Sequence, residues 1–288
     1  MKIIHLFFSI FSFIIERVPL LQNLLKSIHF KGKVILVSKI NKKYLKSEKF
    51  IDSVNGLKYE FNLKDEIQKY IYFNVYERRS WKLVKNYIKK GDICIDVGAN
   101  VGFYSLNFAK IIGDKGKVFS FEASPNTFQV LKKNIYLNNF ENNIYFYDIA
   151  ISDKKGEVIF SLSDEHDHSG WGHIGYDSRY NSIKVPTTTL DEFLEENNLL
   201  NVDFLKVDIE GAEDLLLIGA EKSLKANRIK CVFIEFSGMD EAAINYRIKR
   251  FSDFGYSLIS PIDVLNEINS GKRFSKSVTD NMLFVLKK

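Results

Sequence analysis

The chain has 288 residues, of which 45% are hydrophobic and 27% charged, a composition typical of a globular protein with one large α/β domain and an added segment, or with two small domains. Four prolines, 16 glycines and no repeated or low-complexity tract exclude a long flexible linker. The net charge of +5 conceals an asymmetry, because residues 1–90 hold 19 Lys and Arg against seven Asp and Glu, whereas the remainder is acidic.

The basic N-terminal part begins with an apolar stretch from Ile3 to Ile15. Its 13 residues are fewer than the roughly 20 that span a bilayer, and no cleavage site of a secretory signal follows. We therefore expect a helix that packs on the domain or lies in a membrane interface, so residues 1–49 are a candidate for peripheral membrane contact. The excess charge could instead be a solvated face. Nucleic acid is not an expected partner, because no recognition motif accompanies the charge.

Two cysteines, Cys94 and Cys231, lie inside apolar runs. This pattern is typical of buried thiols in a reducing compartment, so we expect a cytoplasmic protein. Neither cysteine has a His or Cys nearby in the sequence, and we expect no metal site and no catalytic thiol there.

The first 90 residues predict a helical start and a hairpin. Residues 3–28 read as one helix or two, with Pro19 as the break. Asn55-Gly56 stands between two alternating runs and predicts a β-hairpin over residues 49–63. Apolar residues at helical spacing then predict a helix that Gly91 ends. We divide the chain into a basic helical extension (1–50), a hairpin and helix leading into the core (51–90), and a main domain (91–288).

From residue 91 onward short apolar runs alternate with helical patterns. Such alternation predicts a parallel sheet covered on both faces by helices. Ligands of these sheets bind outside the carboxyl ends of the strands, where the strand order reverses. The predicted strands cover residues 93–97, 117–123, 143–151, 157–163, 182–188, 202–210, 229–237, 256–261 and 281–287, and the predicted helices cover 103–113, 126–139, 189–198, 212–227 and 239–255.

A glycine-rich turn follows the first of these strands, in the stretch "DVGANVG". Gly98 permits a sharp turn and a close approach to bare backbone, and Gly102 permits close packing of the next helix. Asn100 occupies a position where φ can be positive, which Asn tolerates better than most residues. Asp96 ends the strand with a carboxylate that a hydrophobic core does not need.

Acidic residues also end the next two strands. Glu122 lies 24 residues after Gly98, where a carboxylate can accept two hydrogen bonds from a ribose diol. Asp148 and Ala150 follow the third strand, where they could hold an adenine amino group. Either acid could instead cap a helix. Together, at three successive strand ends, these residues describe a nucleoside site.

The spacing of the glycines distinguishes between two candidate cofactors. The dinucleotide pattern is G-x-G-x-x-G, whereas this chain has G-x-x-x-G with Asp96 two residues before the first glycine. A carboxylate would repel a pyrophosphate and attract a cation. We therefore expect S-adenosylmethionine, which carries a sulfonium and an ammonium group, rather than NAD.

The chain resembles the FkbM family of S-adenosylmethionine-dependent methyltransferases. The matching stretches are "YERRSWKLVKNYIKKGDICIDVGANVGFYS", "FEASPNTFQVLKKNI", "AISDKKGEV", "TTTLDEFL" and "VDFLKVDIEGAEDLLLIGA", in the family's order over roughly residues 70–237. Ala123 stands where the family usually has proline. The resemblance implies a Rossmann-like, seven-stranded O-methyltransferase sheet with helices on both faces. It implies that Asp96 and the loop 98–102 border the methionine part of the cofactor, Glu122 the ribose, and Asp148 and Ala150 the adenine.

The acceptor site is less defined. Asp208 and Glu210 come at the end of the fourth core strand, where either could accept a hydroxyl proton or bind the cofactor ammonium, and Lys206 could pair with an inner carboxylate such as Glu235. His173 belongs to the polar loop 163–182, which could cover a sugar-like acceptor or be a solvated loop, and it is our choice of histidine base.

These patterns together predict an S-adenosylmethionine-dependent O-methyltransferase. The resemblance points to a hydroxyl of a sugar, a glycan or glycolipid, or a polyketide-like acceptor. Two alternatives are an NAD-dependent oxidoreductase and a non-catalytic nucleoside-binding module.

Overall fold

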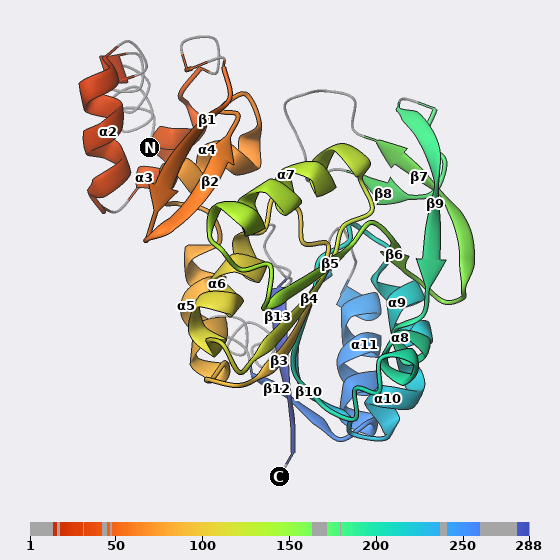
Figure 1. Cartoon of the computed structure of the whole chain (residues 1–288). Coiled ribbons are helices and arrows are strands. Elements are labelled where there is room, and N and C mark those ends of the chain that lie inside the picture. The colour runs from red at the N-terminus through yellow and green to blue at the C-terminus, as the bar shows by residue number, and fades with distance from the viewer. Residues whose placement is uncertain are drawn as a thin grey trace. The chain divides into compact units, whose positions relative to one another are not determined.

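The described residues form two compact units (Figure 1), one that extends to Arg79 and one that begins at Ser80. The finer three-part division of the chain stays a prediction. The computed structural model describes residues 14–15, 18–30, 32–41, 45–46, 48–162, 172–178, 180–236, 241–259 and 281–287.

The first unit contains short helices and the predicted hairpin. Its elements are α2 (Pro19–Ser27), α3 (Lys33–Ser38), β1 (Phe50–Val54), β2 (Leu57–Phe61) and α4 (Glu66–Tyr72). Pro19 stands at the start of α2, where its missing N–H costs nothing. The hairpin is confirmed: β1 and β2 pair antiparallel, and Asn55 and Gly56 both have positive φ, as a tight two-residue turn requires.

The prediction of one continuous helix before Gly91 is wrong. The segment is divided into α4, α5 (Arg78–Val84) and the 3₁₀ turn η2 (Lys85–Tyr87). The chain leaves helical geometry at Asn74 and Glu77, whose φ values are 55° and 44°. Tyr72 packs its ring against Phe50 and Phe61 of the hairpin, so tertiary packing outweighs the helical spacing here.

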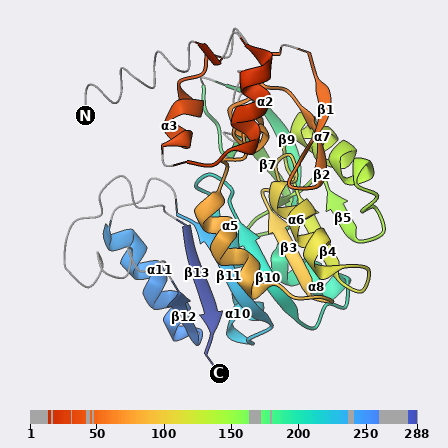
Figure 2. The same cartoon turned by 90° about the vertical axis from the view of Figure 1, so that its left-hand side faces the viewer.

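The second unit is built on a seven-stranded sheet of order β12-β13-β11-β10-β3-β4-β5, and Figure 2 shows the strands following one another in this order. All neighbours pair parallel except β13, which is antiparallel to both β11 and β12. The strands are β3 (Ile93–Val97), β4 (Lys117–Phe121), β5 (Ile144–Tyr147), β10 (Val202–Val207), β11 (Ile229–Glu235), β12 (Tyr256–Ile259) and β13 (Asn281–Leu286).

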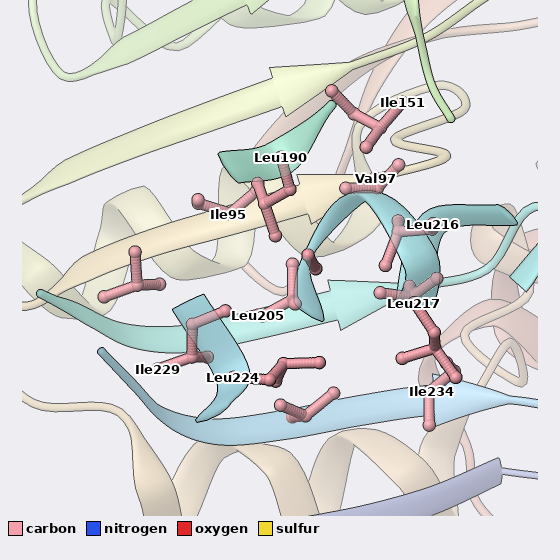
Figure 3. Close-up of a cluster of buried hydrophobic side chains, with 14 of the residues drawn as sticks. Ile95, Val97, Ile151, Leu190, Leu205, Leu216, Leu217, Leu224, Ile229 and Ile234 are labelled. Atoms are coloured by element: carbon pink, nitrogen blue, oxygen red, sulfur yellow. The ribbon is translucent and has the colours of Figure 1, made fainter. Parts of the chain in front are cut away.

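Helices cover both faces of this sheet (Figure 1), which confirms the predicted fold class. The main apolar core lies between the strands and the helices that follow β9 (Figure 3), with Ile95, Val97 and Leu205 of the sheet against Leu216 and Leu217. The helices are α6 (Phe103–Ile112), α7 (Pro125–Leu137), α8 (Leu190–Glu196), α9 (Glu213–Gly219), α10 (Glu221–Lys225) and α11 (Glu241–Asp253).

A second sheet has the order β6-β9-β7-β8. Its strands are β6 (Ala150–Ile151), β7 (Gly156–Leu162), β8 (His173–Ile174) and β9 (Asn181–Thr188). The predicted strand 143–151 is therefore corrected: it ends at Tyr147, and Ala150 belongs to the other sheet.

The predicted helix 212–227 is also divided, into α9 and α10. A Cβ atom on Gly219 would lie 2.0 Å from the backbone oxygen of Ser152. The end of α9 thus packs directly against the backbone that connects β6 to β7, and helical geometry stops at Ala220. In the part of the chain that the structure describes, no helix combines the length and the apolar character needed to cross a bilayer.

Candidate functional site

The strand order reverses beside β3, because β4 and β5 follow on one side of it and β10 and β11 on the other. The carboxyl ends of β3 and β10 are adjacent, with Asp96 in register with Lys206 and Val97 with Val207. This edge is where sheets of this kind place their ligands. The sequence-predicted residues Asp96, Gly98 and Asp208 all lie here.

Gly98 permits the closest approach at this edge. Its φ is +74°, and a Cβ atom there would lie 1.8 Å from the backbone oxygen of Asp208. The Asp208 N–H in turn donates to the Val97 carbonyl. The glycine therefore lets the end of β10 pack directly on the turn after β3.

The remaining turn residues adopt the predicted backbone geometry. Asn100 has a φ of 50°, and its side-chain oxygen accepts a hydrogen bond from the N–H of Val101. Gly102 precedes α6 with a φ of +95°, and a Cβ atom there would lie 2.9 Å from a methyl group of Leu131 on α7. Both glycines are thus required by local geometry before any ligand is considered.

Glu122 links this turn by hydrogen bonds to the end of β4. Its Oε2 accepts from the Asn100 N–H at 2.9 Å and its Oε1 from the Ser124 N–H at 2.8 Å. The side chain is only 7% exposed. Burial raises the pKa of Glu122 to about 7, although the two N–H donors and Lys206 favour the charged form. Each oxygen retains a lone pair for a further donor, so a role toward a ribose diol is compatible with these contacts.

Asp96 does not present its carboxylate to solvent. The side chain is 0% exposed, and its Oδ2 accepts a hydrogen bond of 2.6 Å from Ser105. Its Oδ1 lies 3.4 Å from the ammonium of Lys206. The cation beside Asp96 in this structure is thus a lysine of the same protein, and the expected contact of Asp96 with the cationic cofactor stays a prediction.

Lys206 is the centre of the ion pairs at this edge. Its Nζ lies 3.4 Å from Oδ1 of Asp96 and 3.4 Å from Oδ2 of Asp208. Lys206 thus pairs with these two carboxylates and not with Glu235, the partner that the sequence suggested. Burial alone would lower the pKa of Lys206, but the carboxylates of Asp208 and Asp96 outweigh burial and raise it. The Asp208 side chain remains 24% exposed, so it is the member of this trio that a ligand can reach.

The turn after β10 carries two more acids. Glu210 is exposed and has a φ of 50°, an uncommon conformation for this residue type. Partial desolvation and the charges of Asp208 and Glu213 raise the pKa of Glu210 to about 7. Glu213 is buried at the start of α9, where one oxygen accepts from the Gly211 N–H and the other accepts no hydrogen bond. Glu210 is therefore an exposed acid at this edge, in contrast to the buried Glu122 and Glu213.

The other predicted residues are placed as follows. Asp148 is exposed and directly follows β5. The residue before it, Tyr147, accepts a hydrogen bond at its carbonyl from the Glu122 N–H. Ala150 is buried at the start of β6. His173 lies in β8 of the second sheet, with its ring edge-on to that of Tyr180. Its role as a base stays a prediction. His166, His168 and Trp171 of the same loop lie outside the described residues.

Sequence reasoning missed the serines of this site. Ser120 donates a 2.8 Å hydrogen bond to Ser105, which donates to Asp96. The signal was a polar residue inside the apolar strand "KVFSF", at the position that faces Asp96 on the neighbouring strand. Among the residues that the structure describes, no group of three or more His, Cys, Asp or Glu side chains is arranged to hold a metal ion.

The sheet order, the antiparallel strand beside its edge and the glycine turn with acidic strand ends define a nucleoside-binding fold of the Rossmann-like methyltransferase class. Residues 96–258, more than half of the chain, match the model of the Methyltransferase FkbM domain. The chain therefore belongs to the FkbM methyltransferase family, whose cofactor is S-adenosylmethionine.

Two curated relatives are similar to part of the chain. The chain is 25% identical over 166 residues to the 2-O-methyltransferase NoeI of Sinorhizobium fredii, covering 53% of this chain and 66% of that protein. It is 27% identical over 160 residues to the hexuronic acid methyltransferase AglP of Haloferax volcanii, covering 55% of this chain and 62% of that protein. The chain thus spans less than two thirds of either relative.

Solved structures are similar at a lower level. A Thermotoga maritima S-adenosylmethionine-dependent O-methyltransferase is 14% identical with a TM-score of 0.44, over 84% of this chain and 78% of that one. Aeropyrum pernix fibrillarin with bound S-adenosyl-L-methionine is 14% identical with a TM-score of 0.41, over 83% of each chain. Similarity at this level carries no information about activity.

The residues at the sheet edge fit S-adenosylmethionine. Asp96, Asp208 and Lys206 together hold one more negative than positive charge, and the reachable member is the carboxylate of Asp208. A cationic ligand gains from this surplus, whereas a pyrophosphate would be repelled. Glu122 offers acceptor oxygens at the neighbouring strand end. The charge and the acceptor oxygens agree with the family's cofactor and disfavour the NAD alternative.

Proposed function

We propose that this protein transfers a methyl group from S-adenosylmethionine to a hydroxyl oxygen of a sugar-containing acceptor. The observation that carries the proposal is the family match over a sheet edge at which the Asp208 side chain is partly exposed and Glu210 is exposed two residues further on. One relative is named for 2-O-methyl transfer and the other for a hexuronic acid, which favours oxygen as the atom and a sugar as the acceptor. Glycolipids and polyketide-like hydroxyls remain in the acceptor class that we test.

Each residue has a defined task in this proposal. Bound S-adenosylmethionine supplies a methyl group activated by a positively charged sulfur. Asp208 attracts the cationic end of the cofactor, and Glu122 accepts hydrogen bonds from its ribose. The acceptor oxygen would form a bond to the methyl carbon as the bond between that carbon and the cofactor sulfur breaks, which would leave a neutral thioether. Glu210 takes the proton that the acceptor oxygen loses. Positioning of the acceptor supplies much of the acceleration, so loss of the base reduces turnover without abolishing it.

A methyl-transfer assay tests this proposal. The protein is incubated with S-adenosylmethionine and a panel of sugars, nucleotide sugars and glycolipids, and products are detected by mass. We expect one methyl gained by a hydroxyl-bearing acceptor, and Asp208→Asn should lower the rate. Asp253→Asn, in an exposed pair with Lys249 on α11, is the matched control and should leave the rate unchanged. Methylation at nitrogen or carbon, or no transfer although the cofactor binds, would contradict the proposal.

We also propose that residues 1–49 contact an anionic membrane surface. Leu20 and Leu24 on α2 are 76% and 54% exposed, whereas Leu25 on the same helix is buried. Their spacing of four residues places them on one stripe of the helix. Residues 18–49 contain eight lysines and one acidic residue, a charge that complements anionic lipid. Location in the cytoplasm stays a prediction.

Vesicle co-sedimentation tests this contact. We expect binding to phosphatidylserine-containing vesicles that weakens with added salt and with the double change L20D/L24D, and little binding to neutral phosphatidylcholine vesicles. Leu200, 75% exposed in the second unit, provides the control change Leu200→Asp, which should not alter binding. Equal binding by the double variant, or no binding to anionic vesicles, would overturn this proposal.

A further inference from the structure

A buried row of polar side chains crosses the three central strands of the large sheet. Ser120 of β4, Asp96 of β3 and Lys206 of β10 are register neighbours. The residues that alternate with them, such as Val97 and Leu205, belong to the apolar core on the other face. The polar row therefore faces α6, which contributes Ser105 and the ring of Tyr104 to it.

Asp96 cannot serve a ligand directly while this row is intact. It has no exposed surface, one of its oxygens accepts from Ser105, and the other accepts no hydrogen bond and has the ammonium of Lys206 at 3.4 Å. A buried carboxylate needs a compensating cation, and Lys206 supplies it. The charge of Asp96 is thus neutralised inside the protein.

Lys206 extends from this buried charge to the edge of the sheet. Its Nζ donates to the Gly98 carbonyl at 2.8 Å and to the Val97 carbonyl at 3.4 Å, and it lies 3.4 Å from Asp208. One ammonium therefore contacts both the turn after β3 and the acid after β10. The side chain is almost fully buried, so it has little freedom to move away from either.

We propose that Lys206 is a positioning residue that holds the Asp208 carboxylate and the Gly98 turn in place for the cationic end of the cofactor, and that Asp96 acts on the cofactor through Lys206 and not by contact. This inference rests on the proposed binding of S-adenosylmethionine at this edge. It gives a role to the carboxylate of Asp96, which has no exposed surface. It also assigns the exposed negative charge of the site to Asp208.

Isothermal titration with four variants tests this inference. Lys206→Met alone leaves two carboxylates without a cation and could unfold the protein, so the core variant is the double change D96N/K206M, which removes the buried pair as a unit. We expect circular dichroism to show it folded and its affinity for S-adenosylmethionine to fall about tenfold. Asp208→Asn should cause a similar loss, and the triple variant D96N/K206M/D208N should lose no more than Asp208→Asn alone.

The control is Lys230→Met, which removes another lysine–aspartate pair between β10 and β11 and should leave the affinity unchanged. A second probe is methylthioadenosine, which lacks the amino-acid part of the cofactor and should bind the double variant as it binds the wild type.

The outcomes separate the two proposals. If the wild type binds no S-adenosylmethionine, the proposed function fails. If it binds, and the losses of the double change and of Asp208→Asn multiply in the triple variant, Lys206 supports the fold without acting through Asp208, and this inference is overturned. The same holds if the double variant loses affinity for methylthioadenosine equally.

Discussion

At the scale of single residues, Gly98 is a position where the structure leaves no room for a side chain. Gly98→Ala would force a left-handed φ on alanine and place its Cβ 1.8 Å from the Asp208 backbone oxygen. Gly91 has a comparable φ of +84° with nothing within 4 Å, so Gly91→Ala isolates the cost of backbone conformation. We expect Gly91→Ala to lower the free energy of unfolding by about 1 kcal/mol and Gly98→Ala by about 3 kcal/mol or more. Urea denaturation measures both, and equal losses would contradict this account of Gly98.

Glu122 gives a prediction for how the free energy of unfolding depends on pH. Its pKa is raised from 4.5 to about 7 in the folded protein. The native state therefore holds this proton more tightly than the unfolded chain, and the stability so gained is complete below pH 4.5 and is lost as the pH rises through about 7. The free energy of unfolding of the wild type, relative to Glu122→Gln, should fall by about 3 kcal/mol between pH 4 and pH 8. A difference that stays constant over this range would show that Glu122 is not desolvated as described.

The sequence indicated which residues gather at this edge but not how they pair. The glycine turn and the acidic strand ends follow from local patterns, and the positive φ of Asn100 was predicted correctly. The pairing of Asp96 with Lys206 was not predicted, because it depends on the register of two strands more than 100 residues apart. A lysine inside the apolar strand "VDFLKV" was the available signal, since a buried lysine requires a carboxylate close by.

At the scale of elements, the turn between β10 and α9 combines backbone strain with the proton acceptor that we propose. Glu210 has a left-handed φ of 50°, which Asn adopts more readily than Glu or Gln. We expect Glu210→Asn to raise the free energy of unfolding by about 0.5–1 kcal/mol, whereas Glu210→Gln relieves no backbone strain. Both changes remove the carboxylate and should lower kcat.

The pH profile of kcat completes this test. With Glu210 as proton acceptor, kcat of the wild type should rise as the pH increases through about 7, the pKa of this group, and both variants should lose this rise. Variants with the turnover and pH profile of the wild type would assign the proton to another group, of which His173 is our sequence-based candidate.

Helices and strands were predictable where one pattern persisted, and not where tertiary contacts interrupted it. The strands β3, β4, β10 and β11 follow from their apolar runs, whereas β8 lies in the stretch 163–182 that was predicted to be a loop. The apolar run 143–151 contains residues of two sheets, because β5 ends at Tyr147 and β6 pairs with β9 instead. The helical spacing of 212–227 likewise continues past Gly219, where the contact with Ser152 divides it. Such interruptions come from distant segments and leave no periodic signal.

At the scale of the whole molecule, positive charge gathers in the N-terminal 90 residues, a range that crosses from the first unit into the second. The basic excess lies within residues 1–90, and the acidic sheet edge belongs to the unit that begins at Ser80. Charge and fold class could therefore be assigned from the sequence. The acceptor could not be assigned from the sequence. Residues that select a sugar act through the shape of a site and its hydrogen bonds, and the spacing of residues in the sequence does not predict these.

The central claim is that S-adenosylmethionine binds at the carboxyl edge of the sheet, with Asp208 as the acid that reaches it. A crystal structure of the protein with S-adenosylhomocysteine tests this claim most directly. We predict that the ligand lies against the turn 98–102, with oxygens of Asp208 and Glu122 at hydrogen-bond distance, about 3 Å, and with Asp96 still paired to Lys206. A ligand bound elsewhere on the protein, or one that displaces Lys206 and binds Asp96 itself, would contradict the account.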